Sequence, residues 1–465
     1  MLTGVSGAPI DRTYPPPSIG AVAPKGGVLG LLPELGRDAL GLLTRVTRDY
    51  GDLVQIRLGL TQMVVVGHPD LVEEVLVTRN HDYRKGESTR RLGSLLGRGL
   101  LLSEGDFWLR QRRLMQPAFH RQRLAQMAET MIDSADQLAA TWRDGDERLV
   151  NQEMTELTLR IVGRTLFGTD VGEDLERIRH ATVVLGDHFR SRLYSLLTLL
   201  PDSVPTPGNR RYQAAVRDLD EFVYRIIGER RRDGEPGDDL LGMLLSARDE
   251  RARGMDDRQL RDEVMTLLLA GHDTTALALT WAFVLLAQHP DTATRLHSEV
   301  DTVLADRGIT VADARHLRYV DEVVTETLRL YPTAWAIGRE AIQDTRIGGR
   351  QVRRGTTVLM VPWVIQRDPR FFDTPEMFRP ERWADGLAER LPRFAYMPFG
   401  GGQRVCIGSG FAQLEATLLL ATIAQRFHLE LTDPWMTVEP WPVVTLRTRT
   451  DVPMRLRRRE SHAAA

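Results

Sequence analysis

Apolar residues three and four positions apart predict helices through the middle of the chain. This spacing holds, for example, from Leu157 to Phe167, where it places the apolar side chains on one face of a helix. The pattern also predicts one long helix from about Asp256 to His289, which Pro290 ends. Loops rich in glycine, proline and aspartate are expected to interrupt the helical region at residues 201–208 and 233–239.

Strands are predicted at three places outside this helical region. Leu53–Leu58 and Met63–Val66 are rich in β-branched and aliphatic residues and are separated by a short loop, which is typical of a hairpin. Further short strands are expected around residues 346–361 and 443–456, and an apolar helix around 409–427. The chain is therefore predicted to be mainly α-helical with small β-sheets, an α+β fold.

The first 26 residues are rich in proline and glycine and are expected to form an extended lead-in to a single domain at 27–465. No basic segment followed by an unbroken apolar run occurs near the N-terminus, so no signal peptide is expected. The most apolar segment, Ala276–Ala287, is shorter than the roughly 20 residues that a membrane-spanning helix needs. The protein is therefore expected to be soluble and cytoplasmic, without a membrane anchor.

Composition narrows the possible functions. Lys plus Arg (61) nearly equal Asp plus Glu (63), and a net charge of −2 argues against nucleic-acid binding. Cys406 is the single cysteine, which excludes an intrachain disulfide, a paired-cysteine redox site and a zinc or iron–sulfur site built from several cysteines. Any role of Cys406 is therefore that of a lone thiol.

The segment around Cys406 combines features that suit a metal-bound thiolate. A lone cysteine is more often a buried, inert side chain, but its neighbours here favour a function. After Phe399, the glycines 400–402 let the backbone approach a flat cofactor, and Gly408 does so on the other side. Arg404 offers a cation for a carboxylate. A helix predicted just after the cysteine is expected to lower the thiol pKa.

This segment resembles the haem-binding loop of the cytochrome P-450 family, Phe-x-x-Gly-x-Arg-x-Cys-x-Gly, at every position. The resemblance implies haem b (iron protoporphyrin IX) as cofactor, Cys406 as the ligand to iron, and haem contacts from Phe399, Gly402, Arg404 and Gly408. A thiolate ligand favours cleavage of the O–O bond, whereas histidine suits oxygen carriage. A phosphate-binding loop fits poorly, because no Lys-Ser or Lys-Thr follows the glycines.

Two further motifs resemble the parts of the family that lock the cysteine loop. Glu326 and Arg329 are three apart on one helical face, which alone is typical of a surface ion pair. Tyr331-Pro332 follows them, however, as in the family's Glu-x-x-Arg helix. Arg382 lies in a segment that resembles the one whose arginine completes a buried Glu-Arg-Arg network. The resemblance implies that Glu326, Arg329 and Arg382 are structural.

The segment Ala270–Thr275 places polar residues inside the predicted long helix. Aspartate and threonine in mid-helix compete for backbone hydrogen bonds, so a local distortion is expected, with a simple packing kink as the alternative. The segment resembles the family's Ala-Gly-x-Asp/Glu-Thr-Thr motif, in which a helix bulge opens an oxygen pocket. The resemblance implies an acid–alcohol pair, with Thr274 holding water and Asp273 relaying protons from solvent.

The resemblance also implies the remaining contacts to haem and substrate. Trp108 and Arg112 match the Trp-x-x-x-Arg helix whose side chains reach a haem propionate, and Arg339 stands near the position of another propionate partner. Segments that contact substrate in the family match six mostly apolar positions besides Thr274. These are Leu100, Leu101, Ala270, Ala334, Trp335 and Val444. An apolar pocket predicts a hydrophobic substrate such as a terpenoid, fatty acid or steroid, with a terpenoid preferred.

Electrons are expected from a separate ferredoxin or flavodoxin with its NAD(P)H reductase. The chain lacks the cysteines of an iron–sulfur module, and no length remains for a flavin domain. Five arginines are candidates for a docking face, although a scattered, solvated surface explains them nearly as well. They are Arg110, Arg113, Arg121, Arg123 and Arg393.

Three functions remain open on the sequence alone. The leading one is a reductase-dependent monooxygenase that inserts one atom of O2 into a C–H bond of a hydrophobic molecule. A haem-thiolate peroxygenase or isomerase needs no electron delivery, but such relatives generally lack the pair seen here as Asp273 and Thr274. A non-catalytic haem sensor or carrier is the third, and only the same pair argues against it.

Overall fold

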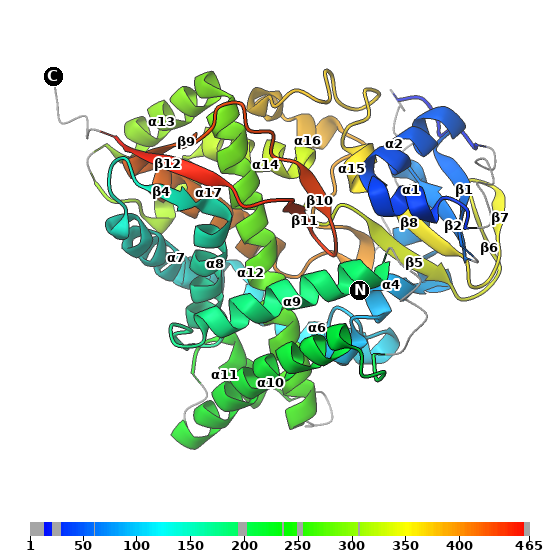
Figure 1. Ribbon diagram of the computed structural model, residues 1–465, viewed down its shortest axis with the longest axis horizontal. Helices are drawn as coiled ribbons and strands as arrows, with labels where there is room; N and C mark the ends of the chain where they lie inside the picture. Colours follow the sequence, from blue (N-terminus) through cyan, green and yellow to red (C-terminus); the bar gives the residue numbers. More distant parts are fainter. Residues whose placement is uncertain are drawn as a thin grey trace, which may run out of the picture.

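A computed structural model describes residues 14–20, 29–59, 61–193, 202–234, 237–248, 254–305 and 307–459. Figure 1 shows a large helical region beside a smaller region rich in β-strands. The predicted lead-in lies mostly outside the described residues. Its described part, 14–20, is irregular and is attached to the body of the protein, because the Ser18 amide donates to Asp52 Oδ2 at 2.8 Å.

The long helix α12 (Asp257–Gln288) is the central element of the helical region (Figure 1). It is buried on almost every face because apolar residues follow one another from Val264 to Leu286 with few polar interruptions. α8, α14 and α17 pack directly on it. The bounds of the longer helices are α2 Ala39–Tyr50, α6 Gly105–Met115, α7 Arg121–Thr141, α8 Val150–Leu166, α9 Leu175–Leu193, α10 Pro207–Asp233, α13 Pro290–Leu304, α14 Arg318–Leu330 and α17 Ser409–Arg426.

Several shorter helices connect these elements. They are α1 Leu32–Arg37, α3 Pro69–Glu73, α4 Glu87–Arg90, α5 Gly93–Leu96, α11 Leu240–Ser246, α15 Pro362–Ile365 and α16 Leu387–Arg390. α10 begins within the predicted loop at 201–208, because Thr206 caps the helix by accepting a hydrogen bond from the Asn209 amide at 3.1 Å. Residue 201 lies outside the described residues. At the other end of α10, Gly234 adopts a positive φ of 73° and stops the helix.

The main sheet has five strands in the order β1-β2-β8-β5-β3, with only β2 and β8 parallel. A three-stranded sheet has the order β4-β12-β9, and two-stranded pairs are formed by β6 with β7 and by β10 with β11. The bounds are β1 Leu53–Leu58, β2 Thr61–Val66, β3 Tyr83–Lys85, β4 Glu147–Leu149, β5 Ile337–Ala341, β6 Thr345–Ile347, β7 Arg350–Val352, β8 Thr357–Met360, β9 Phe427–Leu431, β10 Pro440–Pro442, β11 Leu446–Thr448 and β12 Pro453–Arg458.

The fold class predicted from the sequence is confirmed, and most elements lie where the patterns place them. The early hairpin is β1–β2, with Leu53 opposite Val66. The long helix begins at Asp257 and ends at Gln288, within one residue of the expected bounds. Strands β3 and β5 were not predicted, because each is short and carries charged residues in place of a clear alternation.

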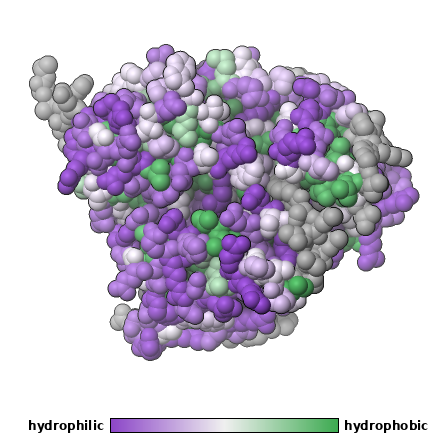
Figure 2. Space-filling view, in the orientation of Figure 1, coloured by the Kyte–Doolittle hydropathy of each residue, from purple (hydrophilic) through white to green (hydrophobic). Residues whose placement is uncertain are grey.

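α12 is also the one helix of the described residues that is long and apolar enough to cross a membrane. Within its most apolar window, 78% of the residues are buried inside the protein, as in the core helix of a folded domain. Figure 2 shows that hydrophilic residues dominate the visible face and that apolar residues form small, separate patches.

Candidate active site

Cys406 lies in the turn between a short 3₁₀ segment, Gly402–Arg404, and the start of α17. Its amide donates to Phe399 O at 3.0 Å, which closes the loop. The side chain is exposed, yet burial by surrounding protein raises the thiol pKa, while the Gly408 N–H and the charge of Arg112 lower it. The sulfur is therefore accessible to a ligand although surrounding protein lies close to it.

The predicted lowering of the thiol pKa is wrong for the protein alone. The helix after Cys406 does supply an N–H, from Gly408, but desolvation outweighs it, so the pKa rises. A bound metal cation deprotonates a coordinating thiol, so it would hold this sulfur as a thiolate.

The glycines before Cys406 are required for packing within the protein. A Cβ on Gly402, whose φ is +65°, would lie 2.2 Å from the Leu76 carbonyl oxygen. A Cβ on Gly401 would lie 2.1 Å from the Phe394 ring. Both approaches are too close for any side chain, so these two glycines let the loop pack against neighbouring segments.

Four cations from four segments of the chain gather at the cysteine loop. Arg112 Nη1 donates to Val405 O at 2.8 Å. Arg404 Nη1 donates to Ser103 O at 2.8 Å, and its guanidinium lies over the Trp108 ring, 3.9 Å from the centroid. Arg404 also pairs with Glu104. Arg339 and Lys85 are cross-strand partners in β5 and β3.

These cations have shifted pKa values because burial disfavours their charged forms. Burial, followed by repulsion from Arg404, lowers the pKa of Arg339 to about 10. Burial, followed by repulsion from Arg339 and Arg404, lowers the pKa of Lys85 to about 7, and Glu104 only partly offsets this. The cluster therefore carries more positive charge than the protein neutralises. Sequence reasoning missed Lys85, since a single lysine in a three-residue strand has no motif to mark it.

Glu326, Arg329 and Arg382 form one buried network. Arg329 donates to Glu326 through Nε at 2.8 Å and Nη2 at 2.9 Å, and Arg382 Nε donates to Glu326 Oε1 at 2.9 Å. Trp383 Nε1 donates to Glu326 Oε2 at 2.9 Å. Glu326 and Arg329 are completely buried. Arg329 also donates to the carbonyls of Gln366 and Pro375, each at 2.7 Å, so the network joins α14 to the segment before the cysteine loop.

The expected helix bulge at Ala270–Thr275 is absent, since α12 is continuous through this segment. Two of its polar side chains bond back to the helix: Thr274 Oγ1 donates to Ala270 O at 3.0 Å, and His272 Nδ1 lies 2.6 Å from Leu268 O. Ala270 is nevertheless exposed and Thr274 half-buried, in a helix otherwise almost fully buried. This stretch of α12 is therefore accessible from one side.

Asp273 does not contact Thr274. Its carboxylate accepts hydrogen bonds from Thr445 Oγ1 at 3.0 Å and from Arg447 Nη2 at 2.5 Å. Both donors belong to the C-terminal hairpin β10–β11, 172 and 174 residues further along the chain. Sequence reasoning could not find them, because nothing in the local pattern links a late β-turn with a mid-chain helix.

The predicted substrate positions lie in several environments. Leu100 is buried, and its amide donates to Glu263 Oε2 at 2.8 Å. Trp335 is buried in an apolar cluster and donates from Nε1 to Val443 O at 3.2 Å. Val444, at the tip of the β10–β11 turn, is 51% exposed. Leu101 and Ala334 are half-buried.

Comparison with known proteins identifies the family. A sequence model of the family described as Cytochrome P450 matches residues 23–454. The chain belongs to the cytochrome P-450 family. It is 38% identical over 401 residues to cyclooctatin synthase of Streptomyces melanosporofaciens, covering 85% of this chain and 87% of the relative. It is also 37% identical to cyclooctat-9-en-7-ol 5-monooxygenase of the same species, covering 91% and 92%, and 37% identical to pentalenene oxygenase of Streptomyces avermitilis, covering 85% and 88%.

This cytochrome P-450 is therefore a haem-thiolate monooxygenase, and its cofactor is haem held through a cysteine thiolate. The residues present fit that cofactor. Cys406 is the single cysteine of the chain, and its side chain is accessible within a closely packed loop. The positive charges of the buried Arg339 and the half-buried Lys85 and Arg404 suit the two carboxylates of haem b.

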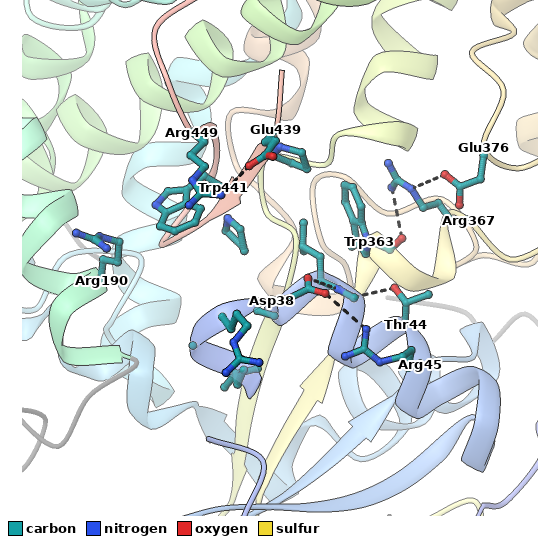
Figure 3. Close-up of a pocket in the computed structure, with 18 of the residues that line it drawn as sticks. Asp38, Thr44, Arg45, Arg190, Trp363, Arg367, Glu376, Glu439, Trp441 and Arg449 are labelled. Carbon is teal, nitrogen blue, oxygen red and sulfur yellow. Dashed lines mark hydrogen bonds and ion pairs between the residues drawn. The ribbon is translucent and has the colours of Figure 1, made fainter. Parts of the chain in front are cut away.

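The P-450 also has a large surface groove with a volume of about 750 Å³ (Figure 3). Figure 3 shows it between the N-terminal helices α1 and α2, with Asp38 and Arg45, and the hairpin that carries Trp441 and Arg449. Two guanidinium groups lie near the Trp441 ring. The guanidinium carbon of Arg449 is 4.8 Å from the ring centroid, and that of Arg190 is 5.8 Å from it. The groove therefore has an aromatic wall flanked by cations.

Proposed function

We propose that this P-450 hydroxylates or epoxidises a terpenoid, using O2 and electrons from a separate ferredoxin or flavodoxin with its reductase. The support for a terpenoid is twofold. Two of the relatives given above are named for the oxidation of cyclooctat-9-en-7-ol and pentalenene, which are terpenoids. The proposed substrate positions in this chain are mostly apolar, as a hydrocarbon-rich substrate requires.

In this proposal Cys406 is the ligand to iron, and bound haem supplies the activation of oxygen. Arg112, Arg339, Arg404 and Lys85 bind the haem carboxylates, while Trp108, Phe399, Gly402 and Gly408 shape the pocket around the cofactor. Glu326, Arg329 and Arg382 hold the cysteine loop in position. We propose further that residues 27–465 form one haem domain and that the protein is soluble and cytoplasmic.

Proton delivery is assigned to two residues of α12. Thr274 holds a water molecule with its hydroxyl on the accessible side of the helix, and Asp273 passes protons to that water from solvent. The observation that carries this assignment is the accessibility of Ala270 and Thr274 on a helix whose other central residues are buried. A peroxygenase has no need of such a pair.

Two measurements test the proposal. A panel of sesquiterpenes, diterpenes, fatty acids and steroids is titrated into the ferric protein, and only terpenoids are expected to shift the Soret band. A shift confined to another class would contradict the substrate assignment.

Thr274→Ala is then expected to lower the product formed per NADPH consumed by about tenfold or more, since a positioned proton donor contributes roughly 10²–10⁴-fold to rate. Thr294→Ala, on the exposed surface of α13, is the matched control. Unchanged coupling in Thr274→Ala would favour a peroxygenase.

A further inference from the structure

The C-terminal hairpin fixes the carboxylate of Asp273 at both oxygens. Thr445 binds Oδ2 and Arg447 binds Oδ1, at 3.0 and 2.5 Å. Asp273 is only 8% exposed, so a guanidinium and a hydroxyl stabilise its charge where water has little access. Within the described part of the chain, Arg447 makes the only ion pair of Asp273. The position of this carboxylate therefore depends on the hairpin.

The turn at 443–445 is attached to two elements of the proposed substrate pocket. Trp335, after α14, donates from Nε1 to Val443 O at 3.2 Å. Trp281 of α12 donates from Nε1 to Leu446 O at 3.1 Å, and the Leu446 amide donates to Thr333 O at 3.0 Å. The backbone on either side of Val444 is thus fixed, while Val444 itself is 51% exposed.

The same hairpin also forms a wall of the groove. Trp441 lines the groove and is the direct cross-strand partner of Arg447. Side chains of directly opposed residues in an antiparallel pair lie on one face and contact each other. A molecule that contacts the turn or Trp441 therefore acts on the strand that carries Arg447.

We propose that Arg447 is the positioning residue of proton delivery, and that the β10–β11 hairpin couples substrate contact at Val444 and Trp441 to the placement of Asp273. Arg447 and Thr445 hold the carboxylate in position through their hydrogen bonds. A proton taken up from solvent passes through Asp273 to the water at Thr274, and the carboxylate returns to Arg447. This inference rests on the proposed role of Asp273 in proton delivery.

The test uses the haem-loaded enzyme and the panel compound that gives the largest Soret shift. Arg447→Ala is expected to lower the rate of product formation on the order of tenfold and to raise the solvent isotope effect on that rate. The dissociation constant of the compound should stay within about twofold, since Arg447 acts on proton transfer. Arg447→Lys should restore most of the rate, and Thr445→Val should show a smaller loss.

A double-mutant cycle separates positioning from general stabilisation. If Arg447 acts through Asp273, Asp273→Asn with Arg447→Ala should be no slower than Asp273→Asn alone. The shifts in thermal midpoint should be equally non-additive, which tests the pair without turnover. The control is Arg457→Ala. Arg457 lies on β12, and its replacement removes an exposed ion pair with Glu430 of β9. This variant should change neither the rate nor the thermal midpoint.

The outcomes distinguish the two proposals. If Asp273→Asn itself leaves coupling and rate unchanged, the proton-delivery role fails and the role of Arg447 fails with it. If Asp273→Asn uncouples the enzyme while Arg447→Ala and Thr445→Val behave as wild type, only the positioning role is wrong. The same holds if the rate losses of Asp273→Asn and Arg447→Ala multiply in the double variant. Should Arg447→Ala not fold, Thr445→Val alone and combined with Asp273→Asn gives the same decision.

Discussion

At the scale of single residues, Lys85 has the most unusual environment in the candidate haem site. Its side chain is surrounded by protein beside two arginines, with Glu104 as the one acid that offsets them, and its pKa falls to about 7. An ammonium group in this setting is unfavourable unless an anion joins it. A haem carboxylate is such an anion.

Lys85→Met is therefore expected to weaken haem retention by roughly tenfold, because hydrogen bonds to charged groups contribute about 1.5–3 kcal/mol. Transfer of haem to apomyoglobin measures this directly. Arg84→Met is the control, since Arg84 is the next residue of β3 but pairs with Glu340 on the exposed side. Equal transfer rates for Lys85→Met and wild type would place Lys85 outside the haem contacts.

Glu415 is a second residue whose environment predicts a measurable effect. It is completely buried in α17, and burial raises its pKa to about 8. Its carboxyl group is ionised in the unfolded chain above about pH 4.5 but stays protonated in the folded protein up to about pH 8. The folded state thus binds more protons in this window, and stability falls as pH rises through it.

Glu415→Gln is expected to remove this loss, so that its urea midpoint declines less than that of wild type between pH 5 and 8. Each pKa unit of difference corresponds to about 1.4 kcal/mol. Glu430→Gln, an exposed carboxylate on β9, should keep the wild-type slope. If the urea midpoints of Glu415→Gln and wild type fell in parallel as pH rises, Glu415 would not be a buried neutral acid.

At the scale of elements, the Glu326 network joins α14 to the segment that precedes the cysteine loop. Removing the carboxylate leaves two buried guanidinium groups without their partner, at a cost of about 3–5 kcal/mol. Glu326→Gln should therefore lower the free energy of unfolding by an amount in this range, as measured by urea denaturation. Glu439→Gln, which breaks an ion pair with both side chains 56% exposed, should cost less than about 1 kcal/mol. Similar losses in the two variants would contradict a structural role for Glu326.

The elements that the sequence predicted well are those with long, regular patterns. α12 and α17 show apolar runs of more than four turns, and β1 and β2 adjoin in sequence. Strands β3 and β5 have no such pattern, and they pair across more than 250 residues. The cysteine loop was readable because its motif is local. The contacts of Asp273 and Lys85 could not be predicted from the sequence, because tertiary packing alone brings their partners together.

At the scale of the whole molecule, the distribution of arginines bears on electron delivery. The candidate docking residues also interact within the protein: Arg123 lies 3.5 Å from Asp238, and Arg393 lies 3.5 Å from Glu73. Arg113 is exposed near the end of α6, one residue after Arg112 of the candidate haem site. We regard Arg113 as the most informative position for a test of docking.

Arg113→Glu is expected to slow reduction by an acidic ferredoxin several-fold at low salt and to weaken the dependence of the rate on ionic strength, because charge steering is screened over about 10 Å at 0.1 M salt. Stopped-flow reduction under carbon monoxide measures this rate. Arg457→Glu on β12 provides the same charge change elsewhere. If the reduction rates of wild type, Arg113→Glu and Arg457→Glu depended on ionic strength in the same way, docking at Arg113 would be excluded.

The last segments of the chain pair with much earlier ones: β12 pairs with β4, and the hairpin just before β12 binds Asp273. This arrangement has a consequence for biosynthesis. On the ribosome, α12 is made long before Thr445 and Arg447, so the central helix emerges with its acidic side chain uncompensated. Residues near position 450 must leave the exit tunnel before that charge is neutralised. Nascent chains that stop short of them should therefore stay immature and open to proteases, even when the cysteine loop is already complete.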